Sequence, residues 1–457
     1  MKKVFALLVT VTLIGACFAG CGKSDDKSTS NPDPTKEVVQ EKDEQNEKSE
    51  GEITEDETAE LSGEITFLTN RTDLDLDGTY SDLIAKFNEK HPKVKVKVES
   101  ITDYAGELAV RMQTEEYGDV LMIPDAVPSK EFGKYFESFG TVDDLKDKYQ
   151  EGYLYAKWFD NQVYGLASMC TVQGVVYNKA VFEQAGITSL PKTSDEFLDA
   201  LRAIKEKTDA IPYYTNANSG WTLDQWEDHA YGTLTGDANY KNNMLIKDKE
   251  AFAEGSSHYT IAKLLYDIVK EDGLCEPDPT TCDWEASKGM LNRGEIGCMV
   301  LGNWAVQQLK DADVNSNNVG YMPFPGTVDG KQYATSGADY SYTVNTHSKN
   351  KEAAKAFIEF LVDESGLALK SGAISLLKND PFPSGLENFE DVMFIVDKPS
   401  DEANMGLLDE LQSTSGITLY DGGARLNGVV DIARGASSET FEEYMKNLNS
   451  AWAAAIK

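Results

Sequence analysis

Strand and helix patterns alternate in the first part of the chain. Short apolar or period-two runs at residues 64–69, 94–100 and 119–123 predict strands, and amphipathic segments at residues 80–92 and 104–116 predict helices. Strands that alternate with helices favour βαβ units, and therefore an α/β fold with a mostly parallel sheet flanked by helices. Ligands of such sheets bind beyond the carboxyl ends of the strands.

More strand and helix patterns follow along the chain than a single sheet with its helices would account for. Residues 163–168 and 174–187 contain two strand patterns, the second followed by a helix, and "SDEFLDALRAIKEKT" at residues 194–208 predicts an amphipathic helix opened by its Ser–Asp pair. Residues 296–310 predict a strand, a glycine turn and a helix, and residues 350–366 predict another helix. Roughly 395 residues belong to this body, which suits two domains better than one core.

The N-terminus has the pattern of a secretory signal peptide. Lys2 and Lys3 precede the apolar run "VFALLVTVTLIGACFAG", which ends in small residues and is short for a membrane span. The sequence "FAGC" is similar to the lipobox of bacterial lipoproteins, which implies cleavage before Cys21 and a diacylglycerol on its sulfur. Cys17 is a rival position, and an ordinary signal peptide is the alternative. We expect residues 1–20 to be a lipoprotein signal peptide.

A strongly acidic segment follows Cys21. Residues 22–60 contain 14 acidic and 5 basic residues and no aromatic side chain. Such a composition cannot bury enough apolar surface to offset the loss of chain entropy, and its charge keeps it extended. We therefore predict that residues 21–61 are a disordered tether, which holds a folded body away from the membrane.

The formal net charge of −34 argues against two kinds of partner. Nucleic-acid binding requires a basic footprint, and an acidic chain is repelled by an anionic membrane surface. Cys170 and Cys298 lie in apolar surroundings and are expected to be buried thiols. The spacing of Cys275 and Cys282 permits a small disulfide loop but does not fit a zinc site, and we expect neither a metal nor a cofactor.

Several segments together resemble one protein family. They are "LIAKFNEKHPKVKVKV", "GDVLMI", "VYGLAS", "GVVYNKAVFEQAGI", "GNWAVQQL", "YMPFPG", "DGKQYATSGADYSYTVN" and "SKNKEAAKAFIEFLV". Their order and spacing resemble the extracellular solute-binding proteins of carbohydrate ABC importers, the family of maltose-binding proteins. They span most of residues 62–366, and the stretch from about residue 373 matches only loosely.

The resemblance implies a two-lobed, periplasmic-binding-protein-like fold of type II, with mostly parallel sheets flanked by helices and a ligand cleft between the lobes. The chain would first cross between the lobes near residues 168–171 and return near residues 337–341. The implied boundaries are residues 62–169 and 337–375 for lobe 1, and residues 170–336 and 376–457 for lobe 2.

The resemblance also implies a function. The protein would be a lipid-anchored monomer on the extracellular face of the cell membrane. It would bind a carbohydrate, most readily an oligosaccharide, and deliver it to the permease subunits of an ABC importer. It would not be an enzyme.

A sugar site needs two kinds of surface. A sugar ring has an apolar C–H face that stacks on aromatic rings, and a rim of hydroxyl groups that binds charged and bidentate partners. Trp304 in "GNWA" and Trp221 in "TNANSGW" are predicted platforms, because family members have aromatic side chains at the matching places. Trp226 is a third candidate. The alternatives are a helix-capping role for Trp304 and packing beneath a helix for Trp226.

Polar candidates lie where predicted strands end. Asn70, Arg71 and Asp73 in "TNRTD" follow the first strand, and an Arg fork beside a carboxylate can clamp sugar hydroxyls. The alternative is a solvated loop with a local ion pair. Asp339 and Tyr340 in "GADYS" fall at the predicted return crossing, where the alternative is a structural turn.

Weaker candidates complete the predicted site. Asp125 follows the strand at residues 119–123. Tyr420 and Asp421 in "TLYDGGARLN" would close the cleft from the second lobe, in the region where the resemblance is loose.

Two other functions remain open. A secreted glycoside hydrolase needs two carboxylates that flank the scissile bond, and 77 acidic residues allow such a pair almost anywhere. The sequence has no GxSxG, HExxH or phosphate-loop motif. A binding protein for another small solute, such as a polyamine, would also use aromatic and acidic side chains, but Arg71 opposes a cationic ligand.

Overall fold

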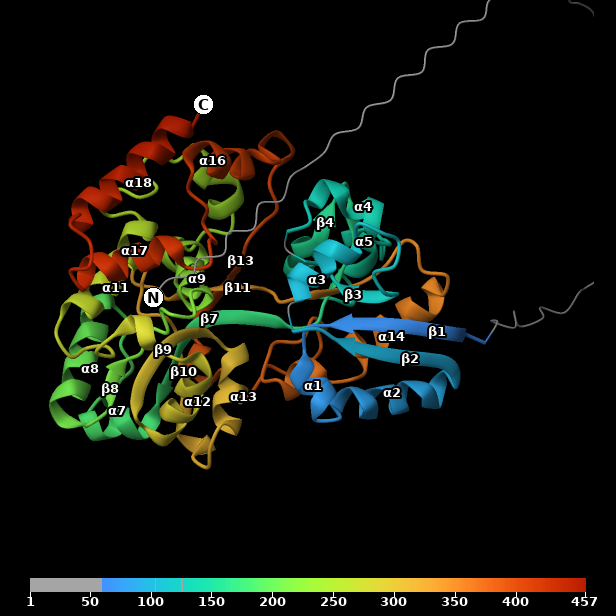
Figure 1. Cartoon of the computed structure of the whole chain (residues 1–457), viewed down its shortest axis with the longest axis horizontal. Helices are drawn as coiled ribbons and strands as arrows, with labels where there is room; N and C mark the ends of the chain where they lie inside the picture. Colours follow the sequence, from blue (N-terminus) through green and yellow to red (C-terminus); the bar gives the residue numbers. More distant parts are fainter. Residues whose placement is uncertain (1–59, 103, 125) are drawn as a thin grey trace, which may run out of the picture. The chain divides into compact units, whose positions relative to one another are not determined.

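The computed structural model describes residues 60–102, 104–124 and 126–457. In these ranges the strands form a five-stranded sheet, a six-stranded sheet and a small ribbon of β4 (Trp158–Phe159) and β5 (Gln162–Val163). Figure 1 shows helices around both larger sheets, as the predicted α/β fold requires. The predicted signal peptide and nearly all of the predicted tether lie outside the described residues.

The first sheet has the strand order β2-β1-β3-β12-β6. Strands β2 and β3 run parallel to β1, as the βαβ pattern predicts, whereas β12 is antiparallel to β3 and β6. The strands are β1 (Ser62–Thr69), β2 (Lys93–Ser100), β3 (Val120–Met122), β6 (Leu166–Ala167) and β12 (Ser341–Val344). The helices of this region are α1 (Thr72–Leu76), α2 (Thr79–Lys90), α3 (Tyr104–Arg111), α4 (Phe132–Tyr135), α5 (Val142–Leu145), α6 (Glu151–Leu154), α14 (Lys351–Asp363) and α15 (Leu367–Lys370).

The second sheet is built around β7 (Cys170–Asn178). Its order is β13-β11-β7-β9-β8, and β10 also pairs with β7. The other strands are β8 (Ile211–Tyr213), β9 (Ile296–Gly302), β10 (Val319–Met322), β11 (Tyr333–Ala338) and β13 (Met393–Val396). The helices of this region are α7 (Lys179–Ala185), α8 (Ser194–Lys207), α9 (Trp221–Glu227), α10 (Gly232–Thr235), α11 (Ser257–Lys270), α12 (Trp284–Arg293), α13 (Trp304–Asp311), α16 (Leu407–Ser415), α17 (Ala424–Ala433) and α18 (Phe441–Ala455).

Strand direction in the second sheet differs from the prediction. Strand β7 is antiparallel to β9, β10 and β11, so the pairing is mixed and not mostly parallel. Parallel pairing occurs at the edges, between β8 and β9 and between β11 and β13. Strands β7 and β11 are antiparallel because the chain crosses the junction between the sheets in opposite directions at these two strands. The sequence did not predict this pairing, because apolar patterning carries no information on strand direction.

The chain passes between the sheets at paired segments. The Ser168 amide donates to the Tyr340 carbonyl at 2.8 Å, and the Asp339 amide donates to the Met169 carbonyl at 2.9 Å. These segments coincide with the predicted crossings near residues 168–171 and 337–341. A further segment joins them, because Cys170 and Ile374 exchange backbone hydrogen bonds of 2.8 and 2.9 Å. The predicted lobe boundaries stay a prediction: the one at residues 169/170 falls between β6 and β7, the one at 336/337 falls inside β11, and the one at 375/376 follows the Ile374 segment.

Local sequence explains where α2 ends and where α8 begins, and it corrects the predicted cap of α8. Helix α2 ends at Lys90, shortly before Pro92, as predicted. Helix α8 begins at Ser194, but its cap is Thr193, whose hydroxyl accepts from the Glu196 amide at 3.3 Å, and not the Ser–Asp pair.

The cysteines and the apolar helices complete the description. Cys170 and Cys298 are fully buried thiols, as predicted. Cys275 and Cys282 are also free thiols, so the disulfide that their spacing permits is not formed. In the part of the chain that the structure describes, none of the helices has the length and apolar character needed to span a membrane.

The prediction of Trp226 as a ligand contact is corrected by its burial. Its side chain has no exposed surface and packs within the core of the second sheet, where its indole N–H donates to the Tyr213 hydroxyl at 2.9 Å. Trp221 begins the same helix and is 40% exposed. Residues five positions apart lie about 140° apart around an α-helix, so the two indoles face different environments.

We predict that Trp226→Ala lowers the free energy of unfolding by about 3–5 kcal/mol, because it removes a buried indole and leaves a cavity. Trp221→Ala on the same helix is the matched control and should have a markedly smaller effect. Urea denaturation followed by circular dichroism measures both. Equal losses for the two variants would contradict the assigned burial.

Candidate functional site

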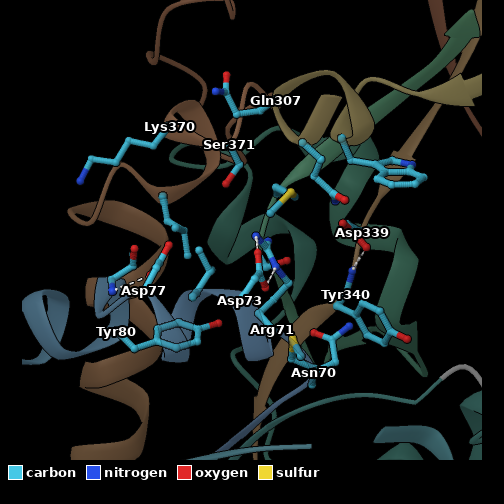
Figure 2. A pocket seen from close by; sticks show the side chains of 18 of the residues that line it. Asn70, Arg71, Asp73, Asp77, Tyr80, Gln307, Asp339, Tyr340, Lys370 and Ser371 are labelled. Carbon is cyan, nitrogen blue, oxygen red and sulfur yellow. Dashed lines mark hydrogen bonds and ion pairs between the residues drawn. The ribbon is translucent and has the colours of Figure 1, made fainter. Parts of the chain in front are cut away.

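A cavity of about 670 Å³ lies where the two sheets meet. Residues from the end of β1, from the crossing segments and from α13 and α15 surround it. The lining residues are Asn70, Arg71, Asp73, Leu74, Asp77, Thr79, Tyr80, Met122, Ser168, Met169, Trp221, Trp304, Gln307, Gln308, Asp311, Asp339, Tyr340, Tyr342, Leu367, Lys370 and Ser371. In Figure 2, Arg71 and Asp73 lie between Tyr80 on one side and Asp339 with Tyr340 on the other.

The cavity brings together most of the residues predicted from sequence. Asn70, Arg71, Asp73, Trp221, Trp304, Asp339 and Tyr340 all line it. Their roles in ligand binding stay predictions. Trp226 does not line the cavity, because it is buried in the core of the second sheet.

The other candidates lie elsewhere. Asp125 is outside the described residues. Tyr420 and Asp421 are not among the lining residues: the Tyr420 hydroxyl donates to Asp228 Oδ1 at 2.6 Å, and Asp421 Oδ2 accepts from the Arg425 amide at 2.9 Å. Both contacts are made within the second lobe, so the prediction that these residues close the cleft has no support in this geometry.

Arg71 and Asp73 form a bidentate ion pair in the cavity wall. Arg71 Nε donates to Asp73 Oδ1 at 2.8 Å and Nη2 donates to Oδ2 at 2.7 Å (Figure 2). The pair stands directly after β1, at the start of α1, so it lies at the carboxyl end of a strand as predicted. Burial acts to raise the pKa of Asp73, but the hydrogen bonds and charge of Arg71 outweigh it and hold that pKa below its ordinary value.

Hydrogen bonds behind the pair fix the backbone of the loop. The Arg71 amide donates to the Thr69 hydroxyl at 3.1 Å, and that hydroxyl is 3.0 Å from the hydroxyl of the buried Tyr80. Burial raises the pKa of Tyr80 to about 12, so Tyr80 stays neutral at physiological pH. Asn70 also lines the cavity, and among the described residues no donor reaches its Oδ1, an atom with almost no exposed surface.

The crossing segments form the floor between the two walls. The Tyr340 amide donates to Asp339 Oδ1 at 2.8 Å (Figure 2), which orients this carboxylate. The Tyr340 ring packs edge-on against Tyr104, with a centroid distance of 6.2 Å. Because backbone bonds link Asp339 to Met169 and Tyr340 to Ser168, side chains from both crossings are held in one place.

Tryptophans form the opposite wall. The Trp221 and Trp304 ring centroids are 5.7 Å apart, and Trp284 packs against both at 5.3 and 6.0 Å. The Trp304 indole N–H donates to Gln225 Oε1 at 3.3 Å. A Cβ on Gly302 would lie 2.5 Å from Trp304 Nε1, so glycine at the end of β9 is a condition for this indole position. The cluster presents apolar ring surface to a cavity whose other wall is charged.

Sequence reasoning missed several lining residues. Gln307, Gln308 and Asp311 follow Trp304 by three, four and seven positions, the spacing of one helix face, so the helix pattern contained a signal for them. Lys370 and Ser371 come from a short helix and the segment after it, where the sequence shows no binding pattern. Within the described residues, no group of three or more His, Cys, Asp or Glu side chains is placed to hold a metal ion.

The chain is similar to proteins of known class. The sequence model of the family described as bacterial extracellular solute-binding protein matches residues 74–368. One similar solved structure is the ABC-transporter binding protein BlMnBP1 of Bifidobacterium animalis subsp. lactis in complex with mannobiose, at 39% identity over 87% of this chain and 95% of that chain, with a TM-score of 0.81.

Two further relatives agree with this match. The manno-oligosaccharide-specific solute-binding protein BlMnBP2 of the same organism, in complex with mannotriose, is 38% identical over 88% of this chain and 96% of that chain, with a TM-score of 0.82. The multiple sugar-binding protein of Streptococcus mutans is 26% identical over 299 residues, which is 63% of this chain and 68% of that protein. The predicted two-lobed type II fold is thereby confirmed.

We predict that Arg71→Gln raises the pKa of Asp73 from its depressed wild-type value, because burial then acts against the backbone hydrogen bonds of Leu74 and Asp73 alone, without the charge and hydrogen bonds of Arg71. Arg71→Lys keeps the charge and should hold the pKa low. In the wild type the pair stabilises the fold above the ordinary pKa, and this contribution is lost as the pH falls through the depressed value. A 13C NMR titration of the aspartate carboxyl carbons, assigned with Asp73→Asn, measures the shift. An unchanged pKa in Arg71→Gln would rule out the ion pair as its cause.

Proposed function

Because this chain belongs to the family of bacterial extracellular solute-binding proteins, we propose that its cavity binds an oligosaccharide, which the protein delivers to the permease subunits of an ABC importer. The observation that carries this proposal is the opposition of two surfaces in one cavity. Trp221 and Trp304 supply aromatic surface on one wall, and Arg71 and Asp73 supply a charged clamp on the other.

These surfaces match the chemistry of a sugar. The C–H face of a pyranose ring stacks on an indole, and its hydroxyl groups act as donors to carboxylates and amide oxygens. Asp339 and Asp73 offer carboxylate oxygens, and Asn70 contributes an amide side chain to the lining. The cavity volume of about 670 Å³ lies within the range of about 300–1,000 Å³ that is typical of small-molecule sites.

Mannosides are the first ligands to consider. The solved structures of BlMnBP1 and BlMnBP2 hold mannobiose and mannotriose, and both proteins align with nearly the whole folded part of this chain at 38–39% identity. We therefore propose a manno-oligosaccharide as the ligand class.

Asp73 does not fit the general acid of a glycosidase. That group needs a raised pKa, whereas Arg71 holds the pKa of Asp73 below its ordinary value. The lining contains Arg71 and Lys370 together with four aspartates (Asp73, Asp77, Asp311 and Asp339), so its charge does not decide against a polyamine; the sugar assignment rests on the aromatic wall and on the manno-oligosaccharide-binding relatives. The family functions by binding and transport, and the protein acts as a monomer in this proposal.

The direct test is isothermal titration calorimetry with mannobiose, mannotriose, maltotriose, raffinose and the polyamine spermidine. We expect at least one of the sugars to bind and to remain intact after long incubation, as judged by chromatography. Trp304→Ala should raise Kd about 5- to 150-fold, because a stacking surface is worth roughly 1–3 kcal/mol. Trp158→Ala is the control, since Trp158 lies in β4 and does not line the cavity.

The possible results separate the alternatives. Cleavage that disappears on replacement of a cavity carboxylate would establish an enzyme. Binding of a polyamine and of none of the sugars would establish a different solute class. Equal effects of Trp304→Ala and Trp158→Ala on Kd would remove Trp304 from the site.

We further propose that the protein is held at the extracellular face of the membrane by a lipid on Cys21, which lies outside the described residues. The sequence supports this, since polar residues begin directly after Cys21. Cys21→Ala should leave the precursor unprocessed or release the protein from the membrane fraction, whereas Cys17→Ala should change neither property. Immunoblots of membrane and soluble fractions measure both. The opposite pattern would move the anchor to Cys17.

A further inference from the structure

Asn303 occupies an unusual position between the tryptophan wall and the crossing segments. It lies between β9 and α13, is 1% exposed and is not among the residues that line the cavity. The side-chain Oδ1 of Asn303 accepts from the Val172 amide at 3.0 Å, and its side-chain Nδ2 donates to the Gly372 carbonyl at 3.0 Å. The backbone N–H of Asn303 donates to the Val172 carbonyl at 3.0 Å. One side chain therefore satisfies backbone groups of two separate segments.

These segments come from opposite sides of the cavity. Val172 belongs to β7, directly after the first crossing. Gly372 follows Lys370 and Ser371, which line the cavity and continue from helix α15 of the first lobe. The residue after Asn303 is Trp304, the first residue of α13 and a member of the tryptophan wall. Asn303 is thus a direct link between the backbone that carries Trp304 and the backbone that carries Lys370 and Ser371.

The chemistry of the link requires an amide side chain. A carboxamide has both an acceptor and a donor, so it can pair with the Val172 N–H and the Gly372 carbonyl at once. An apolar side chain of similar size would leave the buried Val172 N–H and the partly buried Gly372 carbonyl without this partner. An ionised carboxylate would still accept from Val172 but would place a second oxygen against the Gly372 carbonyl.

We infer that Asn303 is a positioning residue for the oligosaccharide site. Its hydrogen bonds to Val172 and Gly372 fix the distance between Trp304 and the cavity-lining residues Lys370 and Ser371. The inference rests on the proposed function. It means that sugar affinity depends on a side chain that does not touch the sugar, because a displaced wall loses its contacts with the ligand.

Asn178 provides a matched control in the same chain. It is also fully buried, its Nδ2 donates to the Leu291 carbonyl at 2.7 Å, and its Oδ1 accepts from the Val181 amide at 3.0 Å. It lies at the far end of β7, does not line the cavity, and its side chain bonds neither the crossing segments nor α13. Replacing either asparagine by leucine removes the same kind of buried hydrogen bonds, so both variants should melt at a lower temperature.

The experiment compares Asn303→Leu and Asn178→Leu with the wild type, by calorimetric titration with mannotriose and thermal melting of the unliganded proteins. We expect Kd to rise about tenfold or more in Asn303→Leu and to change by less than about threefold in Asn178→Leu. Equal losses of affinity would reflect general destabilisation and overturn the inference. So would a wild-type Kd in Asn303→Leu. Absence of sugar binding by the wild type would instead refute the proposed function.

Asn303→Asp gives a second measurement that keeps the test informative if Asn303→Leu fails to fold. A protonated carboxyl can donate to the Gly372 carbonyl, and an ionised one cannot. The affinity of Asn303→Asp, relative to the wild type at each pH, should therefore recover as the pH falls. A ratio that stays constant from pH 8 to pH 5 would contradict the positioning role of this hydrogen bond.

Discussion

Strand β7 makes the pairings on which both the fold and the cavity depend. One edge pairs with β9, and the other pairs first with β11 and then with β10. The crowding around its middle leaves no room for a side chain at Gly174, where a Cβ would lie 2.5 Å from the Met322 carbonyl oxygen. The buried Tyr321 hydroxyl lies 2.7 Å from the Val172 carbonyl oxygen and 3.0 Å from the Leu301 carbonyl oxygen. This hydroxyl therefore links β10 to β7 and β9.

The register of β7 determines where the walls of the cavity stand. Its first residue, Cys170, pairs with Ala338 of β11, so Met169 and Asp339 come to the junction of the sheets. Farther along, Gln173 pairs with Gly302, which ends β9 and places Trp304 at the same junction. The aromatic wall and the polar floor therefore derive from one set of backbone hydrogen bonds. A shift of two residues in either pairing would separate them by roughly 7 Å.

The sequence predicted features that depend on local patterns. A short apolar run located β1, period-two alternation located β2, and the glycine turn located Trp304. It did not predict the antiparallel pairing of β7, because apolar patterning does not encode strand direction. The prediction of Trp226 as a ligand contact is wrong because its five-residue offset from Trp221 turns its indole about 140° around the helix, into the core. Lys370, Ser371 and the contacts of Asn303 depend on long-range packing, which no local pattern reveals.

The central claim is that a sugar lies between the tryptophan wall and the Arg71–Asp73 pair. A crystal structure of the protein with mannotriose tests it most directly. The account predicts a sugar ring stacked on Trp304 or Trp221 with carbon atoms within about 4.5 Å of the indole, and hydroxyl groups within about 3.2 Å of Asp73, Arg71 or Asp339. A ligand bound outside this cavity, or inside it with no ring on either tryptophan, would contradict the account.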